Sequence, residues 1–577
     1  MCATAALPAL GAQQSIDEFF DSFLMKWVRS DPSGSTALRI LPADEQERLD
    51  AKLTDATEEY AHARVARARS GLATLKTFDR SKLTREQQFS ADMLQYLLDD
   101  IVAGEPYMRL SFPLNQMMGL QVRLPTLLTD LHPIRSRRDA ENYIARLQAF
   151  GGNLDQGTAA MRDRDRQGIR PPGFILVETI NQMKRFVSPE PARSILVTSL
   201  SQRLEKVPGI DPAARAAFTQ QAESLVRDSV YPAYRRAMDQ LATQSPKATE
   251  DAGISRLPNG AEAYAFYLRR FTTTNMTSDQ IHQTGLNEVK RIQAEMEELL
   301  KRLGKTEGPL EDRLTKIQTD SRYPDGPDVR AAVLADYAKI IQDANRRSQA
   351  AFDRVPKANC IVQRIPEFQE ANAAANYQPP PPDGSRPGIF RVPLRGPYFP
   401  KMMMRSLAYH EAIPGHHFQL ALQVETPSLP KFRRSSPFGA MSAFSEGWGL
   451  YAERLAADLG WYQGDEVGNL GRLASELFRA RRLVVDTELH MQHWTRQQAI
   501  DYGIPQSEVD RYVVMPGQAC SYKIGQLKIL ELRDKARKEL GSKFTMQQFH
   551  NIVLNNGSIP LTLLQREVDR WIAGQKA

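Results

Sequence analysis

Cysteine, long apolar runs and blocks of one charge are all scarce in this 577-residue sequence. No internal stretch approaches the roughly 20 apolar residues of a membrane-spanning helix, so stable membrane insertion of the body of the chain is not expected. The net charge of +7 comes from 75 basic and 68 acidic residues. No basic block concentrates that charge, which argues against a nucleic acid as partner. Hydrophobic residues make up 42% and charged residues 25%, as in globular proteins.

The first residues and the three cysteines bear on the compartment. The chain begins with small and apolar residues, and Ala9–Ala12 could serve as the cleavage site of a secretory signal, although the charged start of such a signal is missing. Cys2 lies in this segment, whereas Cys360 and Cys520 could pair or stay reduced. We therefore expect a periplasmic or secreted protein, with residues 1–14 a signal-peptide remnant or a disordered tail. Without a signal remnant the protein would be cytoplasmic.

Long amphipathic patterns dominate the chain and predict a mainly α protein. Residues 83–102 begin with a capping box, in which Thr84 is followed three residues later by Gln87, and then repeat apolar residues on one helix face. Residues 277–304 keep the same period and end at Gly304, a favourable C-cap. Similar patterns recur near residues 137–165, 212–243, 329–353, 469–493 and 524–540.

One short segment favours a strand. Residues 388–395, GIFRVPLR, alternate in part and follow NYQPPPPDGSRPG, which is too rich in proline and glycine to be helix. The chain shows no repeat of fixed period and no long linker. We expect residues 15–577 to form one large, multi-lobed helical unit, with its functional core within residues 385–530 and a small β element beside it.

The segment YHEAIPGHHFQL, residues 409–420, combines a His–Glu pair with a His–His pair. In the zinc-peptidase helix signature HExxH, the two histidines lie one turn apart and bind one ion. Here His416 and His417 lie six and seven residues beyond His410, which is roughly 9 and 10.5 Å along a regular helix. Ligand atoms must each lie about 2.0–2.2 Å from a zinc ion, so a regular helix excludes a shared ion.

Pro414 and Gly415 indicate that this helix is not regular. Proline lacks the amide hydrogen and clashes with the preceding turn, and glycine tolerates unusual backbone angles. A break there could absorb the two extra residues and bring a second histidine to the ion, with Glu411 beside the water. The alternative is that the histidines sit at a helix end and Glu411 is a solvated charge. Five of the nine histidines fall within residues 410–493, which favours the metal site.

Glu446 is the candidate for a third ligand. It lies in FSEGWGLYAERL, beyond the helix-breaking segment ETPSLPKF, so a separate helix would supply it, as in gluzincin-type zinc sites. Glu453 follows on the same helix face and could support the site or face the substrate. The alternative for Glu446 is a charge that is favoured near a helix N-terminus.

Several motifs resemble the bacterial domain-of-unknown-function 885 family: YHEAIPGHHFQ, SEGWGLYAE, RLVVDTELH and PGQACSYKIG, preceded by IRPP, IHQTGLNEVKRIQAEM and DGSRPGIF. The resemblance runs from near residue 15 to the C-terminus. That family is similar to helical gluzincins such as the angiotensin-converting enzyme, neurolysin-type oligopeptidases and Taq-type carboxypeptidases. The resemblance implies a helical, zincin-like fold around a deep channel, with one Zn²⁺ per chain on its floor and short peptides as substrates.

The resemblance also implies a ligand set. The gluzincins carry HExGH, which aligns with His410 and His416 and leaves His417 as the alternative or as a neighbour of the ligands. The sequence departs from their pattern in the longer spacer and in Leu450, which stands where the relatives have an acidic residue.

Two downstream segments offer donors for the oxyanion that forms during amide hydrolysis. Arg482, Asp486 and His490 lie four residues apart on one predicted helix face. Asp486 could therefore orient His490 toward an oxyanion or a carboxylate, or the three could form an ordinary surface network. In PGQACSYKIG, a turn could deliver Tyr522 or Lys523, and the resemblance implies Tyr522. The alternative is a tyrosine that only packs.

The strand GIFRVPLR precedes the metal segment, where zincins place the edge strand that pairs with the substrate backbone. Arg391 or Arg395 could then bind a peptide carboxylate, as could Arg482. Three functions fit: a zinc-dependent metallopeptidase in which Glu411 activates water, a zinc amidase acting on a non-peptide amide, and a non-catalytic helical peptide-binding protein with a relic site. The intact Glu411 favours an enzyme, and the sequence leaves the oligomeric state open.

Overall fold

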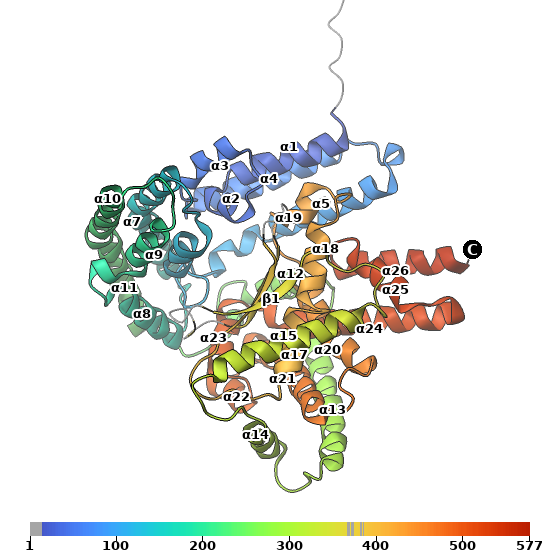
Figure 1. Ribbon diagram of the computed structural model, residues 1–577. Coiled ribbons are helices and arrows are strands. Elements are labelled where there is room, and N and C mark those ends of the chain that lie inside the picture. Colours follow the sequence, from blue (N-terminus) through green and yellow to red (C-terminus); the bar gives the residue numbers. More distant parts are fainter. Residues whose placement is uncertain (1–13, 366–369, 371–373, 381–383, 385, 577) are drawn as a thin grey trace, which may run out of the picture.

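The helix signals in the sequence reappear as helices, several of them with the predicted ends, although the pattern at 212–243 is divided between two α-helices and the pattern at 329–353 ends at Ser348. The computed structural model describes residues 14–365, 370, 374–380, 384 and 386–576 (Figure 1). Residues 1–13, which hold most of the expected signal remnant, lie outside that range. The capping box of Thr84 and Gln87 opens α5 (Arg85–Ala103), and α13 (Ser278–Arg302) ends just before Gly304. The prediction of a mainly α protein is confirmed.

The N-terminal half forms two groups of helices (Figure 1). The first group lies along the top of the view and consists of α1 (Ile16–Arg29), α2 (Pro32–Leu38), α3 (Ala43–Asp50), α4 (Glu58–Leu75) and α5. The second consists of α6 (Leu120–Thr126), α7 (Arg137–Arg166), α8 (Gly173–Val187), α9 (Ile195–Leu204), α10 (Pro212–Leu225) and α11 (Tyr231–Gln244). In this second group α7 and α8 both pack against α11.

The part of the chain from residue 260 onward supplies the remaining helices. Its helices are α12 (Gly260–Thr272), α13, α14 (Leu310–Asp320), α15 (Val329–Ser348), α17 (Met404–Glu411), α18 (His416–Val424), α19 (Lys431–Ser435), α20 (Ser442–Asp458), α21 (Glu466–Met491), α22 (Arg496–Asp501), α23 (Gln506–Val514), α24 (Ser521–Leu540), α25 (Met546–Leu554) and α26 (Leu561–Lys576). Two long pairs dominate the packing: α13 lies along α21, and α20 lies along α24. No helix of the described residues is long and apolar enough to cross a membrane.

A three-stranded sheet is the β element that the sequence predicted. Its order is β1 (Cys360–Arg364), β3 (Gly388–Val392) and β2 (Asn376–Gln378), with β1 parallel and β2 antiparallel to β3. The segment expected to be an exposed edge is therefore the central strand. Because both sides of β3 are already hydrogen-bonded, the prediction that it pairs with a substrate backbone is wrong.

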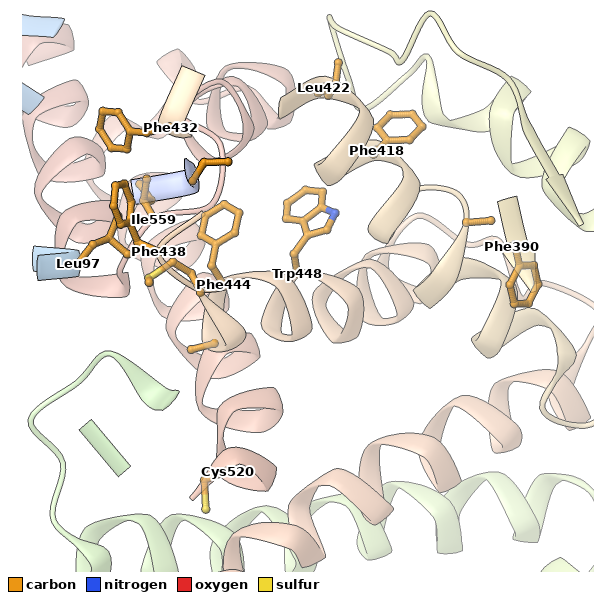
Figure 2. Packing of buried hydrophobic residues seen from close by; sticks show 14 of the residues in the cluster. Leu97, Phe390, Phe418, Leu422, Phe432, Phe438, Phe444, Trp448, Cys520 and Ile559 are labelled. Carbon is orange, nitrogen blue, oxygen red and sulfur yellow. The ribbon is translucent and has the colours of Figure 1, made fainter. Parts of the chain in front are cut away.

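One hydrophobic core joins the two halves of the chain. Its buried residues extend from Ile16 to Ile572, and Figure 2 shows Leu97 of α5 beside Phe438 and Ile559 from the C-terminal half. Cys360 and Cys520 are both free, and Cys520 is buried.

Helices α20 and α24 touch through glycine. A Cβ on Gly447 would lie 2.5 Å from the backbone of Gly525, and a Cβ on Gly525 would lie 1.9 Å from the carbonyl oxygen of Ala443. Real Cβ atoms do not come so close to other heavy atoms, so only glycine allows this approach. The contact brings the start of α24 against the part of α20 that carries Glu446.

Lys523 belongs to a buried ion network and is not delivered to the site. Its ammonium group lies 2.6 Å from Glu476 and 2.8 Å from Glu288, while Arg291 and Arg472 also contact Glu476. Burial works against a charge on Glu476, but Lys523, Arg291 and Arg472 hold its pKa well below the usual range. The network ties α13, α21 and α24 together.

We expect Lys523→Met to lower the free energy of unfolding by about 3–5 kcal/mol, because removing one partner leaves buried charges uncompensated. Lys528→Met is the matched control: Lys528 pairs with Glu531, whose side chain is 60% exposed, so the cost should stay below about 1 kcal/mol. Thermal unfolding of both variants measures the difference. Equal effects would contradict a structural role for the network.

Candidate metal centre

The predicted break in the histidine segment is present. Helix α17 ends at Glu411, and α18 begins at His416. Between them, Ala412 has φ −104° and ψ −101°, and Gly415 has φ −77° and ψ −127°, which are not helical values. The two histidines of the motif therefore lie on two different helices.

Close packing fixes the shape of this break. A Cβ on Gly415 would lie 1.9 Å from the carbonyl oxygen of His410, so a larger residue cannot take this position. The indole Nε1 of Trp448 donates to the carbonyl oxygens of Pro414 at 2.9 Å and Gly415 at 3.2 Å. Figure 2 shows Trp448 rising from its helix toward the one that carries Phe418. These hydrogen bonds from α20 fix the backbone at the break.

The break brings His410, His416 and Glu446 together. The Oε2 atom of Glu446 lies 3.4 Å from Nε2 of His410 and 3.6 Å from Nε2 of His416. One ligand atom from each residue can be chosen so that all lie within 4.8 Å of one another. A tetrahedral zinc ion with bonds of about 2.1 Å separates its ligand atoms by about 3.4 Å. Two imidazoles and a carboxylate at these distances fit zinc.

Helix α20 also orients His410. Nδ1 of His410 lies 2.8 Å from a carboxylate oxygen of Glu453, and Ser406 donates to the other oxygen. A Cβ on Gly449 would lie 2.6 Å from the His410 ring, so this glycine leaves the space that the imidazole fills. A carboxylate on the far nitrogen of a metal-binding histidine fixes its tautomer and raises its basicity. Glu453 therefore supports the site, one of the roles that its spacing suggested.

The carboxylates of the site carry opposite electrostatic shifts. Burial raises the pKa of Glu411, although the two histidines partly offset this effect. Burial also disfavours a charge on Glu446, but His410 and His416 outweigh it and hold the pKa of Glu446 well below its usual range. A carboxyl with a raised pKa beside a carboxylate that stays ionised suits a division between a proton-transferring group and a charged one.

His417 points to the β element and not to Glu446. Its Nδ1 lies 2.8 Å from the hydroxyl of Tyr377 on β2, and burial lowers its pKa to about 4. A Cβ on Gly388 of β3 would lie 2.8 Å from the same nitrogen. Of the two alternatives for the second histidine, the structure brings His416 to the other ligands. His417 instead anchors α18 to the sheet.

His490 and Asp486 do not form the predicted pair. Nδ1 of His490 accepts from the amide of Ile254, and its Nε2 lies 3.1 Å from the carbonyl oxygen of Tyr512. His490 is fully buried, which lowers its pKa to about 4, and both ring nitrogens are occupied. The structure therefore leaves it no nitrogen for an oxyanion. Asp486 accepts hydrogen bonds from Tyr264 and from the amide of Gly517.

Tyr522 at the start of α24 lies against Arg482 of α21. The Arg482 guanidinium lies 4.5 Å from the ring centre of Tyr522, and Arg482 also contacts Glu508 at 2.7 Å. Tyr522 is half-buried in the first turn of α24, close to the glycine contact beside Glu446. Tyr522 stays a candidate for the oxyanion donor.

Arg391 and Arg395 belong to the sheet region. Arg391 lies in the central strand, opposite Gln363 and Asn376. Arg395 donates to the backbone carbonyl of Glu370. Because β3 is the central strand, it does not present these two arginines beside a substrate paired at a free edge.

Sequence reasoning missed four supporting residues: Tyr377, Ser406, Trp448 in its hydrogen-bonding role, and Gly449. The two glycines in SEGWG were a usable signal, because glycine inside a helix marks close approach by another group. Nothing in the sequence pointed to Tyr377 or Ser406, because their roles depend on packing between distant segments.

Comparisons with known proteins agree with this fold. The family described as "Bacterial protein of unknown function (DUF885)" matches residues 32–568. A structure titled as a "putative lipoprotein" from Colwellia psychrerythraea is similar with a TM-score of 0.91 and 30% identity, over 97% of this chain and 100% of that one. A second, a "putative lipoprotein of unknown function" from Shewanella oneidensis, has a TM-score of 0.73 and 17% identity, over 96% and 99% of the two chains. A search of curated proteins gives no match.

We expect Gly449→Ala to weaken zinc binding by at least about tenfold, because the new methyl group takes the space of the His410 ring and misplaces a ligand. Gly152→Ala, inside α7 with no heavy atom within 4 Å of its added Cβ, is the control. Competition titration with a chromogenic chelator measures the affinity, and circular dichroism checks the fold. Unchanged affinity in Gly449→Ala would mean that His410 does not bind the ion.

Burial raises the pKa of Asp486 to about 7. The folded protein then holds a proton that the unfolded chain releases, so wild-type stability falls as the pH rises from 4 to 7. Asp486→Asn cannot ionise, and its stability relative to wild type should rise by roughly 2–3 kcal/mol between pH 5 and pH 8. Thermal unfolding at both pH values tests this, with exposed Asp501→Asn as control. A difference that does not change with pH would contradict a protonated Asp486.

Proposed function

The chain belongs to the family described as bacterial protein of unknown function, DUF885. From the geometry of its own site, we propose that it is a zinc-dependent metallopeptidase of short peptides. The observation that carries the proposal is the convergence of His410, His416 and Glu446 beside the buried Glu411. Two histidines, one carboxylate and an adjacent glutamate are the groups that gluzincin-type hydrolysis uses. His410, His416 and Glu446 would hold the ion, one per chain.

A bound zinc ion would supply a Lewis acid for the scissile carbonyl and lower the pKa of a water molecule. The residues of the chain do the rest. Glu411, with its raised pKa, accepts a proton from the attacking water and passes it to the leaving nitrogen as the C–N bond breaks. Glu453 and Ser406 keep His410 in place. Tyr522 is the side chain we assign to the developing oxyanion.

We also propose that the protein works in the cell envelope or outside the cell. The support is the similar structure from Colwellia psychrerythraea, which is titled a "putative lipoprotein" and shares 30% identity over nearly the whole chain. A periplasmic location is the finer form of this proposal, and it rests on the small, apolar start of the sequence.

A zinc amidase that acts on a non-peptide amide would use the same groups, and a non-catalytic binding protein would not need Glu411. Glu411→Gln separates the enzymes from the binding protein. It should keep about one zinc per chain and lose at least about 100-fold in turnover, because only the proton transfer is removed. Zinc content by plasma mass spectrometry and hydrolysis of a pool of short random peptides, followed by mass spectrometry, are the two measurements.

Glu531→Gln, at an exposed position of α24, is the matched control and should keep wild-type turnover. Full turnover in Glu411→Gln would contradict the proposed role of Glu411. Zinc without peptide hydrolysis in the wild type would leave the amidase or the binding protein.

A further inference from the structure

Three arginines gather where α21 meets α23. Arg479 and Arg482 lie one turn apart on α21, and Arg511 lies on α23. Glu508 contacts Arg482 at 2.7 Å and Arg511 at 3.1 Å. We call Arg479, Arg482, Arg511 and Glu508 the arginine cluster. Glu508 neutralises only one of the two positive charges of Arg482 and Arg511. Arg479 adds a further positive charge to the cluster.

The donors of the cluster are not used up by the protein. Arg482 is only 5% exposed, yet its Nε and Nη1 atoms have no hydrogen-bond partner within the described part of the chain. The Nε atoms of Arg479 and Arg511 are buried and without a partner in the same residues. Buried polar groups nearly always have partners, because each unsatisfied donor costs free energy. Other arginines of the described residues also have a buried Nε without a partner, but here several such donors coincide with an excess of positive charge, which suits an anionic ligand.

Aromatic rings shape the surroundings of Arg482. Its guanidinium lies 4.4 Å from the ring centre of Phe478, 4.5 Å from that of Tyr522 and 5.9 Å from that of Tyr512. Stacked rings hold the guanidinium plane in one orientation, which preorganises its N–H groups. Phe478 and Tyr522 are both half-buried, whereas Tyr512 is buried.

The cluster lies next to the metal centre. Helix α21, which carries Arg479 and Arg482, packs against α17, which carries His410 and Glu411. The positive charge of Arg479 lowers the pKa of Glu411 and Glu453 at the candidate metal centre, and it also lowers the pKa of Glu508 in the cluster. A substrate that reaches Glu411 can therefore extend its other end toward the cluster.

We infer that the arginine cluster binds the C-terminal carboxylate of the peptide substrate, which makes the protein a peptidase of short peptides with a free C-terminus. A chain end fits better than an acidic side chain, because every short peptide with a free C-terminus carries that carboxylate whatever its sequence. The inference rests on the proposed function for the cleavage step, but the binding of a carboxylate does not depend on cleavage.

The test is a fluorescence titration of zinc-loaded Glu411→Gln protein with three probes: dansyl-Ala-Ala-Ala as the free acid, the same peptide as its amide, and dansyl-Ala-Ala-Glu amide. The free acid should bind at least about 30-fold more tightly than either amide, because only it brings a terminal carboxylate to unpaired buried guanidinium groups. Arg482→Gln in the same background should reduce the preference to about twofold or less, and Arg511→Gln should weaken it.

Arg481→Gln is the matched control, since Arg481 is the next residue but pairs with Glu311 on α14, and it should keep the preference. Equal binding of the acid and its amide by the Glu411→Gln protein would overturn the inference without any arginine variant. Equal binding of the free acid and the glutamate amide would overturn the assignment to the chain end. If the wild type hydrolyses peptides but the free acid binds no more tightly than the amide, only the role of the cluster is refuted. If the free acid binds more tightly but the wild type hydrolyses no peptide, only the proposed peptidase activity is refuted.

Discussion

Two histidines six residues apart can meet one ion only if the helix that carries them stops between them. The rest of the candidate site depends on this constraint. Helix α17 delivers His410 and Glu411 at its last turn, and α18 delivers His416 at its first. Gly415 allows the backbone to return against the carbonyl of His410. A residue with a side chain at this position would push the two helices apart and separate the ligands.

Helix α20 sets the geometry of the site from the opposite side. Within eight residues it provides Glu446 as a candidate ligand, Trp448 as donor to the break, Gly449 as the space for the His410 ring and Glu453 as the partner of that ring. The glycine contact with α24 fixes α20 in turn, and the network around Lys523 fixes α24 to α21. The ligands are therefore held by packed helices and not by loops, as a preorganised metal site requires.

The sequence was most informative where local chemistry decides the structure. Capping boxes and apolar periods located α5 and α13, and Pro414–Gly415 located the break, because these effects act within one or two turns. Long-range packing could not be predicted in this way. The spacing of Asp486 and His490 suggested a pair, but the fold turns each toward a different backbone segment. The strand at residues 388–392 was found, but its place in the centre of the sheet depends on β1 and β2. The choice between His416 and His417 likewise depended on Tyr377, which lies far away in the sequence.

The central claim is that one ion binds between His410, His416 and Glu446. Crystals of the zinc-loaded protein, measured on both sides of the zinc absorption edge, test it most directly. We expect one strong anomalous difference peak within bonding distance of Nε2 of His410, Nε2 of His416 and a carboxylate oxygen of Glu446, lying about 2.0–2.2 Å from each. A peak at His417, or no peak at this position in zinc-loaded crystals, would contradict the claim.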